Sequence, residues 1–550
     1  ALAAALAAAF VAGALLLPRL TSSREELAAD PPARRFPFSD VSAHEAPELE
    51  ARFAAEPASL ETGAHLAMAL AKGGRVAEAR LLLPRLRQIP GRAADPLVDY
   101  VEGSLAVAAD EPQLALVMFG KALERARTGG RGELLSQIRA ARGHLLSTLG
   151  RGDEALADMQ AALAGFESSH DAPSLARVLN DLAVEELQRG RLAQGERLLE
   201  RALEASREAN PGGTGGGVIL GNLAGISMLR GRPDEAAPRC RETIRTFRDN
   251  GSHRLAWALT DCSVILRDLA LTGEADASLA EALALLASSP AESDFAIALS
   301  YRGDAELASG ERNRAAATAA EIERAASAGG DRPALARADR LRAGLAAQQG
   351  HLATARRLFA EARTLEAGSG QEDAATEIDL EAARIELEFG ELAAAETLVA
   401  QVAASAAGSV REGSAAFFSE ILRAEIDLRE GRIAEAGVRL KGLGDPDRLT
   451  SLARRLALLA ARGHQAASAG QIDAARVDLD RAQREAAAAH LSVEALERRL
   501  DLARLEEAAA LSANPAERRP PATRSRERQQ IVDEAGRLGL TRLARRAADA

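Results

Sequence analysis

The stretch GRGDEA at residues 150–155 decides the fold, because close versions of it return along most of the chain. GRVAEA stands at 74–79, GRPDEA at 231–236, GELAAA at 390–395 and GRIAEA at 431–436. Each version begins with glycine, which readily takes the left-handed backbone conformation that ends a helix. The residues that follow, such as aspartate or proline, favour the first turn of a new helix. Each stretch therefore predicts two helices joined by a tight turn.

The predicted turn recurs at a nearly constant interval. It falls at positions 74, 110, 150, 190, 231, 273, 310, 350, 390, 431 and 470, so the period is about 40 residues. A fixed period of this length is typical of solenoids, in which each repeat buries its apolar face against its neighbours. Gly273 comes late in its unit, which leaves the register of that unit open.

Apolar residues on both sides of the turn follow helical spacing. Leu179, Leu182, Ala183 and Leu187 precede Gly190 in the pattern of a helix with one buried face. Glycine or alanine stands at the middle of the predicted helices, where a small residue lets two helices approach closely. We therefore expect an all-α fold, an α-α superhelix of about eleven helix-turn-helix repeats over residues 49–515.

The composition excludes several classes of function. The net charge is −11 with 27% charged residues, and this acidic balance argues against nucleic-acid binding by the chain. The two cysteines are too few for a four-thiolate zinc site, and the eight histidines include no pair one helical turn apart. The glycine-rich stretch 211–217 lacks the lysine and the preceding strand of a phosphate-binding loop, so we expect a flexible loop between repeats. We expect no catalytic, metal or cofactor site, and hence no enzyme activity in this chain.

The two ends of the chain differ from the repeats. Residues 1–18 contain no charge, and their length suits a transmembrane helix or a signal-like apolar segment, with a buried terminal helix as the alternative. Residues 19–48 are predicted to form a linker. The sequence begins without methionine, so we expect that further residues precede it. At the other end, residues 516–550 predict a basic linker (518–528) and then an amphipathic helix that caps the last repeat.

The repeat units resemble tetratricopeptide repeats. Leu66, Ala67, Leu70, Gly74 and Ala79 follow the order of large and small residues that marks this family. The family's usual unit has about 34 residues, so the units of this chain are longer. The resemblance implies a solenoid of helix pairs and a role in binding other proteins.

Two segments narrow the resemblance. LNDLA at 179–183 and LGNLA at 220–224 are similar to the longer-helix repeats of bacterial signalling proteins. Together with residues 1–18, they resemble the C-terminal repeat region of membrane-anchored proteins in which a kinase or winged-helix domain precedes a single span. The resemblance implies a membrane-tethered protein-protein interaction scaffold or sensor, with the extracytoplasmic side slightly favoured for the repeats. Two alternatives stay open: the C-terminal part of a larger serine/threonine kinase or transcriptional regulator, and a soluble cytoplasmic scaffold.

In this family, partner proteins or peptides usually bind in the concave groove that the first helix of each repeat lines. The resemblance therefore implies groove positions for four polar residues that lie near the same place in their units: Asn180, Asn222, Thr260 and Ser300. An asparagine amide both donates and accepts hydrogen bonds, so it can bind a peptide backbone or bond to the neighbouring repeat. Both interpretations stay open.

The two cysteines fall on helices that would be neighbours in such a stack. Cys240 lies on the second helix of one unit and Cys262 on the first helix of the next. They are either two small buried residues or a disulfide, and an extracytoplasmic location would favour the disulfide.

Overall fold

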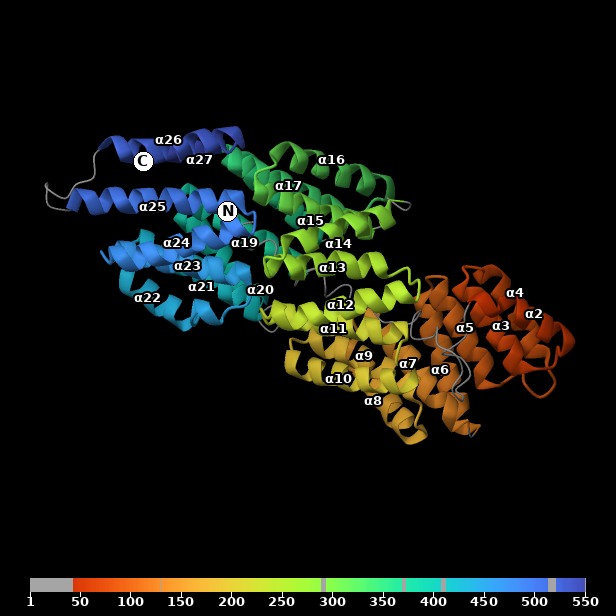
Figure 1. Ribbon diagram of the computed structural model, residues 1–550. Coiled ribbons are helices and arrows are strands. Elements are labelled where there is room, and N and C mark those ends of the chain that lie inside the picture. Colours follow the sequence, from red (N-terminus) through yellow and green to blue (C-terminus); the bar gives the residue numbers. More distant parts are fainter. Residues whose placement is uncertain are drawn as a thin grey trace. The chain divides into compact units, whose positions relative to one another are not determined.

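The computed structural model describes residues 43–129, 131–287, 293–367, 372–406, 412–512 and 521–549. Over these ranges the chain is built of helices and contains no strand, which confirms the predicted all-α class (Figure 1). The helices belong to two compact units. Of the described residues, those up to Leu223 together with Glu242–Ser252 form the N-terminal unit, and Ala224–Arg241 together with those from His253 onward form the C-terminal unit.

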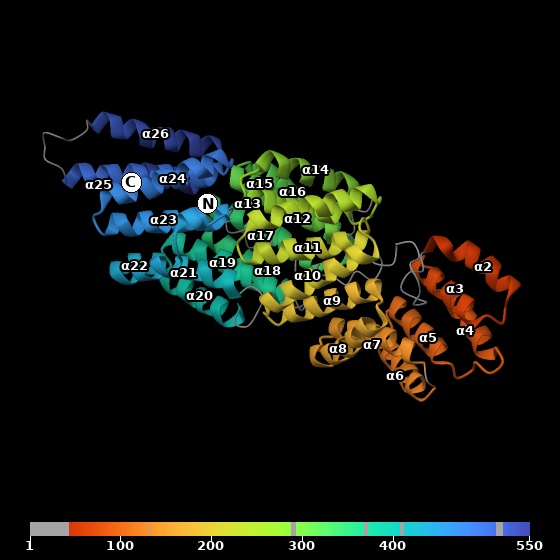
Figure 2. The same ribbon diagram turned by 60° about the horizontal axis from the view of Figure 1, so that its bottom comes forward.

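The N-terminal unit consists of consecutive helices that pack side by side in pairs (Figure 2). Its elements are η1 (Ala43–Glu45), α2 (Ala46–Ala55), α3 (Leu60–Lys72), α4 (Val76–Gln88), α5 (Pro96–Ala108), α6 (Pro112–Thr128), α7 (Gly132–Thr148), α8 (Gly152–Ser169), α9 (Ala172–Gln188) and α10 (Leu192–Ala209). Two further helices cross the division between the units: α11 (Thr214–Leu229) and α12 (Pro233–Asp249).

The C-terminal unit continues the same arrangement. Its elements are α13 (Leu255–Asp268), α14 (Thr272–Leu286), α15 (Ser293–Ser309), α16 (Arg312–Gly329), α17 (Arg332–Gln349), α18 (Leu352–Ala367), α19 (Glu372–Phe389), α20 (Leu392–Ala406), α21 (Glu412–Arg429), α22 (Ile433–Gly442), η2 (Pro446–Arg448), α23 (Leu452–Ser468), α24 (Ile472–Ala488), α25 (Ser492–Ser512), α26 (Pro521–Arg537) and α27 (Thr541–Asp549). Within the described ranges, the pairs from α3–α4 to α23–α24 make eleven repeats, as predicted. The first helix of each repeat is called the A helix below, and the second the B helix.

Left-handed backbone conformations mark the turn inside the repeats. Gly231 has a φ of 69° and Gly310 a φ of 79°, at positions where the sequence predicts turns. The prediction of a turn at Gly273 is wrong, because Gly273 lies inside α14 and Ala270 takes the turn with a φ of 61°. This conformation costs alanine about 1–2 kcal/mol. The Ala270 side chain packs against the apolar cluster that contains Leu452, and this contact offsets part of the strain.

Small residues lie where the two helices of a pair cross. A Cβ atom at Gly103 would lie 2.7 Å from the Phe119 ring, and one at Gly195 would lie 2.6 Å from the Leu187 side chain. Ala155 is 0% exposed at the corresponding place in its repeat. The close approach of A and B helices therefore depends on these residues, as the sequence predicts.

The glycine-rich stretch 211–217 is not the predicted loop along its whole length. Helix α11 begins at Thr214, so the last glycines of the stretch are helical. Gly217 faces the Phe247 ring of α12, and a Cβ atom there would lie 2.7 Å from that ring. Packing against an aromatic ring thus overrides the weak helix propensity of glycine.

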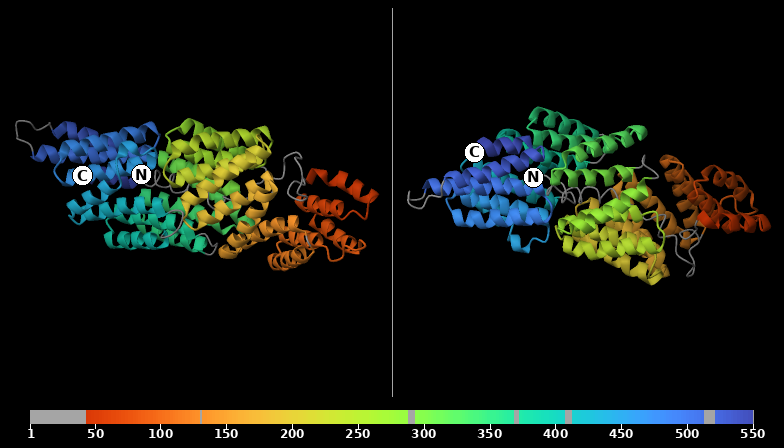
Figure 3. Two further views of the ribbon diagram at one scale, coloured as in Figure 1. Left: turned by 90° about the horizontal axis from the view of Figure 1, so that it is seen from below. Right: turned by 45° about the horizontal axis from the view of Figure 1, so that its top comes forward.

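The C-terminal end differs from the predicted linker and single helix. Helix α26 begins at Pro521, so most of the basic run 518–528 is helical, and α27 follows it (dark blue in Figure 3). Proline is favoured in the first turn of a helix, and Ile531 gives α26 a buried face. Both helices share one apolar cluster with α25, formed by Val493, Leu496, Leu500, Ile531, Ala535, Leu540, Leu543 and Ala547. The two helices, rather than one, cover the apolar face of α25.

Late helices of the C-terminal unit contact early ones. The Ala453 N–H, at the start of α23, donates to Asp268 Oδ1 at the end of α13 over 2.9 Å. The Arg454 guanidinium donates to the Leu229 carbonyl at the end of α11 over 3.3 Å. Successive turns of the superhelix therefore touch within this unit, through helix ends.

The predicted membrane segment at residues 1–18 lies outside the described residues, as does most of the predicted linker 19–48. Among the helices that the structure describes, none combines the length and the apolar character that a membrane span requires.

Candidate functional site

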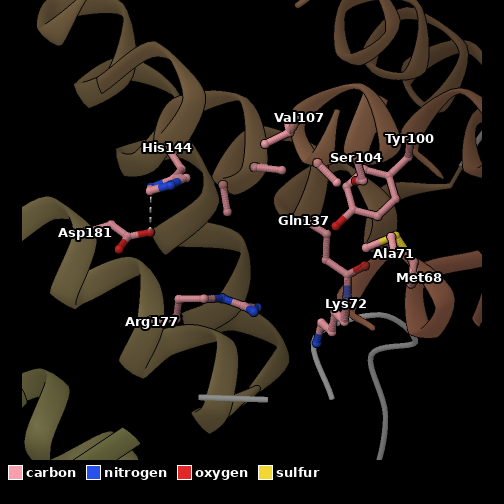
Figure 4. A pocket seen from close by; sticks show the side chains of 13 residues that line it. Met68, Ala71, Lys72, Tyr100, Ser104, Val107, Gln137, His144, Arg177 and Asp181 are labelled. Carbon is pink, nitrogen blue, oxygen red and sulfur yellow. Dashed lines mark ion pairs between the residues drawn. The ribbon is translucent and has the colours of Figure 1, made fainter. Parts of the chain in front are cut away.

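A cavity of about 230 Å³ opens on the A helices of four consecutive repeats in the N-terminal unit (Figure 4). Helices α3, α5, α7 and α9 supply its walls. Side-chain caps fix where two of these helices begin. Asp95 Oδ1 accepts from the Leu97 N–H over 3.1 Å, and Asp171 Oδ1 accepts from the Ser174 N–H over 3.3 Å. The caps hold the first turns of α5 and α9, and so help to set where their cavity-lining residues lie.

One part of the cavity wall is apolar. Met68 and Ala71 come from α3, Val107 comes from α5, and Ala140 and Ala141 come from α7. Such a wall favours an aliphatic group on a ligand, because burying apolar surface is worth about 25 cal/mol per Å².

Two buried polar side chains in the wall lack partners. Gln137 is 5% exposed and Ser104 is 7% exposed. Within the described part of the chain, neither Nε2 nor Oε1 of Gln137 has a hydrogen-bond partner, and neither does Oγ of Ser104. A buried polar group without a partner costs about 1–3 kcal/mol. Both residues line the cavity, and a ligand can satisfy these groups once the side chains that cover them shift.

The cavity also carries an excess of basic groups. Lys72 and Arg177 line it together with a His144–Asp181 pair, whose Nδ1 and Oδ2 atoms lie 3.9 Å apart. The Arg177 side chain extends between this pair and the side of the cavity that holds Gln137 (Figure 4). Arg177 donates to Ser174 Oγ over 3.4 Å, and no carboxylate of the described residues lies within ion-pair distance of it.

The A helices of the C-terminal unit have a different inner lining, made of buried ion pairs. Arg340 of α17 pairs with Asp304 of α15 at 2.7 Å and with Glu381 of α19 at 2.9 Å. Burial raises the pKa of Asp304 above its usual range, although the guanidinium of Arg340 opposes this shift. These charges neutralise one another, so we assign this row of ion pairs a structural role.

A second row of paired charged side chains connects α21, α23 and α25. His464 Nδ1 lies 2.6 Å from Glu425 Oε1, and His464 Nε2 lies 3.1 Å from Asp501 Oδ2. Burial alone would lower the pKa of His464, but the two carboxylates outweigh it and raise this pKa to about 10. The imidazole is therefore held as a cation between two anions.

The four residues predicted for the groove do not line the cavity. Asn222 Nδ2 donates to Asn180 Oδ1 over 2.8 Å, which is the bond between neighbouring repeats that one of the two interpretations proposes. Thr260 Oγ1 and Ser300 Oγ donate to carbonyls of their own helices. Asn180 Nδ2 and Asn222 Oδ1 have no partner within the described ranges, so each amide keeps one unused group. Ligand binding by these four residues stays a prediction.

Sequence reasoning missed Gln137 and Arg177, although a signal for them exists. The two residues lie at equivalent positions of consecutive A helices, among residues that are mostly apolar or small. A polar residue that recurs at one position of the repeat marks a surface of the solenoid that is not used for packing.

Cys240 of α12 and Cys262 of α13 lie next to each other, with their Cα atoms 5.7 Å apart. Both residues are buried, with 1% and 2% exposure. A disulfide spans this distance without backbone movement, so the geometry permits the bond, which stays a proposal.

Comparisons with known proteins agree with this architecture. The family model described as "Tetratricopeptide repeat" matches residues 134–208, which contain Gln137, His144, Arg177 and Asp181. No curated protein matches the chain. The resemblance to bacterial membrane-anchored signalling proteins is not confirmed by these comparisons.

Three of the solved structures that match the chain do so at low sequence identity. The match to a chain of the APC/C hetero-tetramer Cut9-Hcn1 covers 91% of the present chain and 92% of the matched chain, at 14% identity and a TM-score of 0.50. The apo form of RapI covers 59% and 92%, at 12% identity and a TM-score of 0.46. PilF of Pseudomonas aeruginosa covers 43% and 94%, at 16% identity and a TM-score of 0.33. The likeness to the first of these concerns the fold alone.

Proposed function

We propose that the chain is an interaction scaffold that binds a segment of a partner protein in the cavity between α3, α5, α7 and α9, part of which lies in the region that matches the tetratricopeptide-repeat model. The observation that carries the proposal is the buried Gln137 amide in the wall of this cavity, whose donor and acceptor have no partner among the residues that the structure describes. A side chain that serves only packing at 5% exposure would be apolar or would have partners. The role is one of binding and not of catalysis.

The proposal has three more specific forms, which differ in the location of the chain and in the domain to which it is attached. A membrane-tethered scaffold rests on residues 1–18 alone, and a cytoplasmic scaffold needs no such anchor. A larger kinase or transcriptional regulator would carry its effector domain before Ala1. Fractionation of cells that produce the full-length protein separates the first two forms, because a tethered protein stays with the membranes until detergent is added. The reading frame upstream of Ala1 decides the third.

Peptide selection tests the binding function itself. The full chain, immobilised, is used to select binders from a displayed library of random peptides, and selected peptides are then synthesised. We expect their affinity to fall at least about tenfold for Gln137→Leu, a change of about 1.4 kcal/mol. Val477→Ser, at a 65% exposed position of the C-terminal unit, serves as the control and should leave affinity unchanged. The proposal is wrong if no peptide is enriched, or if both variants bind equally well.

A further inference from the structure

We infer that the cavity recognises an acidic, extended segment, with a main-chain amide of that segment on Gln137 and a glutamate or aspartate side chain on Arg177. This inference rests on the proposed function and adds the chemistry of the partner. Three features of the cavity support it: an amide without a partner among the described residues, the basic side chains of the lining and the size.

The amide of Gln137 selects for another amide. Its Nε2 and Oε1 are both buried and unpartnered within the described residues, so the complementary group must accept one hydrogen bond and donate another. The N–H and C=O of one residue in an extended segment point to the same side of the chain and supply this pair, whereas a carboxylate only accepts and an ammonium group only donates. Ser104 Oγ, also buried without a partner in the described chain, provides a third contact beside it.

The basic groups select for a carboxylate. Arg177 and Lys72 line the same cavity, and Arg177 has only a long hydrogen bond to Ser174 within the described ranges. Many arginines of this chain pair with carboxylates, as Arg142 does with Asp158 at 2.6 Å. A guanidinium in a partly enclosed site gains most from a carboxylate, which it can bind with two parallel hydrogen bonds. The acidic net charge of the chain repels most acidic proteins, so this basic cavity adds specificity to the docking.

The size of the cavity limits the ligand to part of an extended chain. A volume of about 230 Å³ lies below the roughly 300–1,000 Å³ of sites that enclose a drug-sized molecule. It accommodates one or two side chains of a segment that continues along the A helices. The apolar wall formed by Met68 and Val107 places an aliphatic side chain next to the acidic one.

The test uses selected peptides resynthesised with acetylated and amidated ends, and dissociation constants measured by fluorescence anisotropy with the full chain. We expect the bound peptides to contain glutamate or aspartate, and replacement of that residue by its amide to weaken binding at least about tenfold. Methylation of the nitrogen that donates to Gln137, scanned along the peptide, should weaken binding similarly at one position only.

A charge swap identifies the partner of the carboxylate. Arg177→Glu should weaken binding of the acidic peptide and restore binding of a peptide in which lysine replaces the acidic residue. Arg197→Glu makes the same change of net charge at an exposed position of α10 and should do neither. Thermal unfolding of both variants checks that they fold. Arg177→Gln, which keeps a polar side chain but removes the charge, should also weaken binding of the acidic peptide.

The outcomes separate this inference from the proposed function. Peptides that depend on Gln137 but carry no acidic residue, or that bind Arg177→Glu as well as Arg197→Glu, would overturn the inference and leave the binding function in place. Binding that requires a free C-terminal carboxylate would also overturn it, because the carboxylate would then come from the chain end. Failure to select any peptide would remove both.

Discussion

The guanidinium of Arg542, on the last helix, pairs with the carboxylate of Glu388 at 2.5 Å, although 154 residues separate them in the chain. The same guanidinium lies 4.2 Å from the centre of the Phe389 ring. It therefore uses its edge for an ion pair and its face for a cation–π contact, which lysine cannot do at one time. Within the C-terminal unit this contact attaches α27 to the end of α19.

This attachment predicts a loss of stability in Arg542 variants. Arg542→Ala should lower the free energy of unfolding of the C-terminal unit by about 2 kcal/mol, because it leaves Glu388 with one fewer partner. Arg542→Lys should recover only part of this loss. Hydrogen exchange of α27 amides reports the effect locally. Arg545→Ala, at an exposed position of the same helix, is the control and should not accelerate exchange.

Because of the ion pairs of His464, we expect the free energy of unfolding to depend on pH. Its pKa rises from 6.5 to about 10 in the folded chain. A raised pKa stabilises the folded state below the unfolded pKa, and this contribution is lost as the pH rises from about 6.5 towards 10. The difference in unfolding free energy between the wild type and His464→Gln should therefore be largest near pH 6 and shrink in alkaline solution. A difference that stays constant with pH would contradict the ion pairs with Glu425 and Asp501.

We expect Gln137→Leu to raise the stability of the chain as well as to weaken peptide binding. The substitution removes two buried polar atoms that lack partners within the described residues, and it keeps a similar volume. The free energy of unfolding of the ligand-free chain should rise by about 1 kcal/mol. Gln113→Leu makes the same chemical change at an exposed position of α6 and should leave stability nearly unchanged. Denaturant titration of the three proteins compares them.

Two glycines of the N-terminal unit predict effects of opposite sign. Gly103→Val should destabilise the chain by about 1–3 kcal/mol, because its side chain would overlap the Phe119 ring. Gly120→Ala, in a helix with open space around the position, should stabilise it by up to about 1 kcal/mol through helix propensity. Phe119→Leu combined with Gly103→Val should recover part of the loss, as thermal unfolding would show.

A disulfide between Cys240 and Cys262 would make the oxidised and reduced chains differ in stability. If the bond forms, the oxidised chain should be about 2–4 kcal/mol more stable than the reduced chain, since the closed loop restricts the unfolded state. Thiol alkylation followed by mass spectrometry measures the bond directly. The double variant Cys240→Ala and Cys262→Ala should show no response to reductant. Free thiols in an oxidising buffer would contradict the bond.

The helix pairs could be predicted because their signals act within one repeat. Gly231 ends one helix, Pro233 begins the next, and Ala236 permits their contact, all within a few residues of chain. The error at Gly273 arose where a tertiary contact replaced the local signal, since Ala270 takes the turn and packs against residues nearly two hundred positions away.

The candidate site was only partly open to prediction. The family resemblance indicated that A helices would carry it, and polar residues at Gln137 and Arg177 are visible in the sequence. Whether a polar side chain finds hydrogen-bond partners depends on the helices that surround it. Only the folded chain therefore shows that the Gln137 amide has no partner among the residues described.

Fold class, repeat number and the positions of the A and B helices thus follow from residue patterns that are local to each repeat. Only the tertiary structure decides the pairing of Arg542 with Glu388 and the contact of Ala453 with Asp268. The same holds for the hydrogen-bonding groups of the cavity that lack partners among the described residues. The physical reason is cumulative geometry: each repeat adds a small rotation to the one before, and side chains many repeats apart meet only after these rotations have been summed.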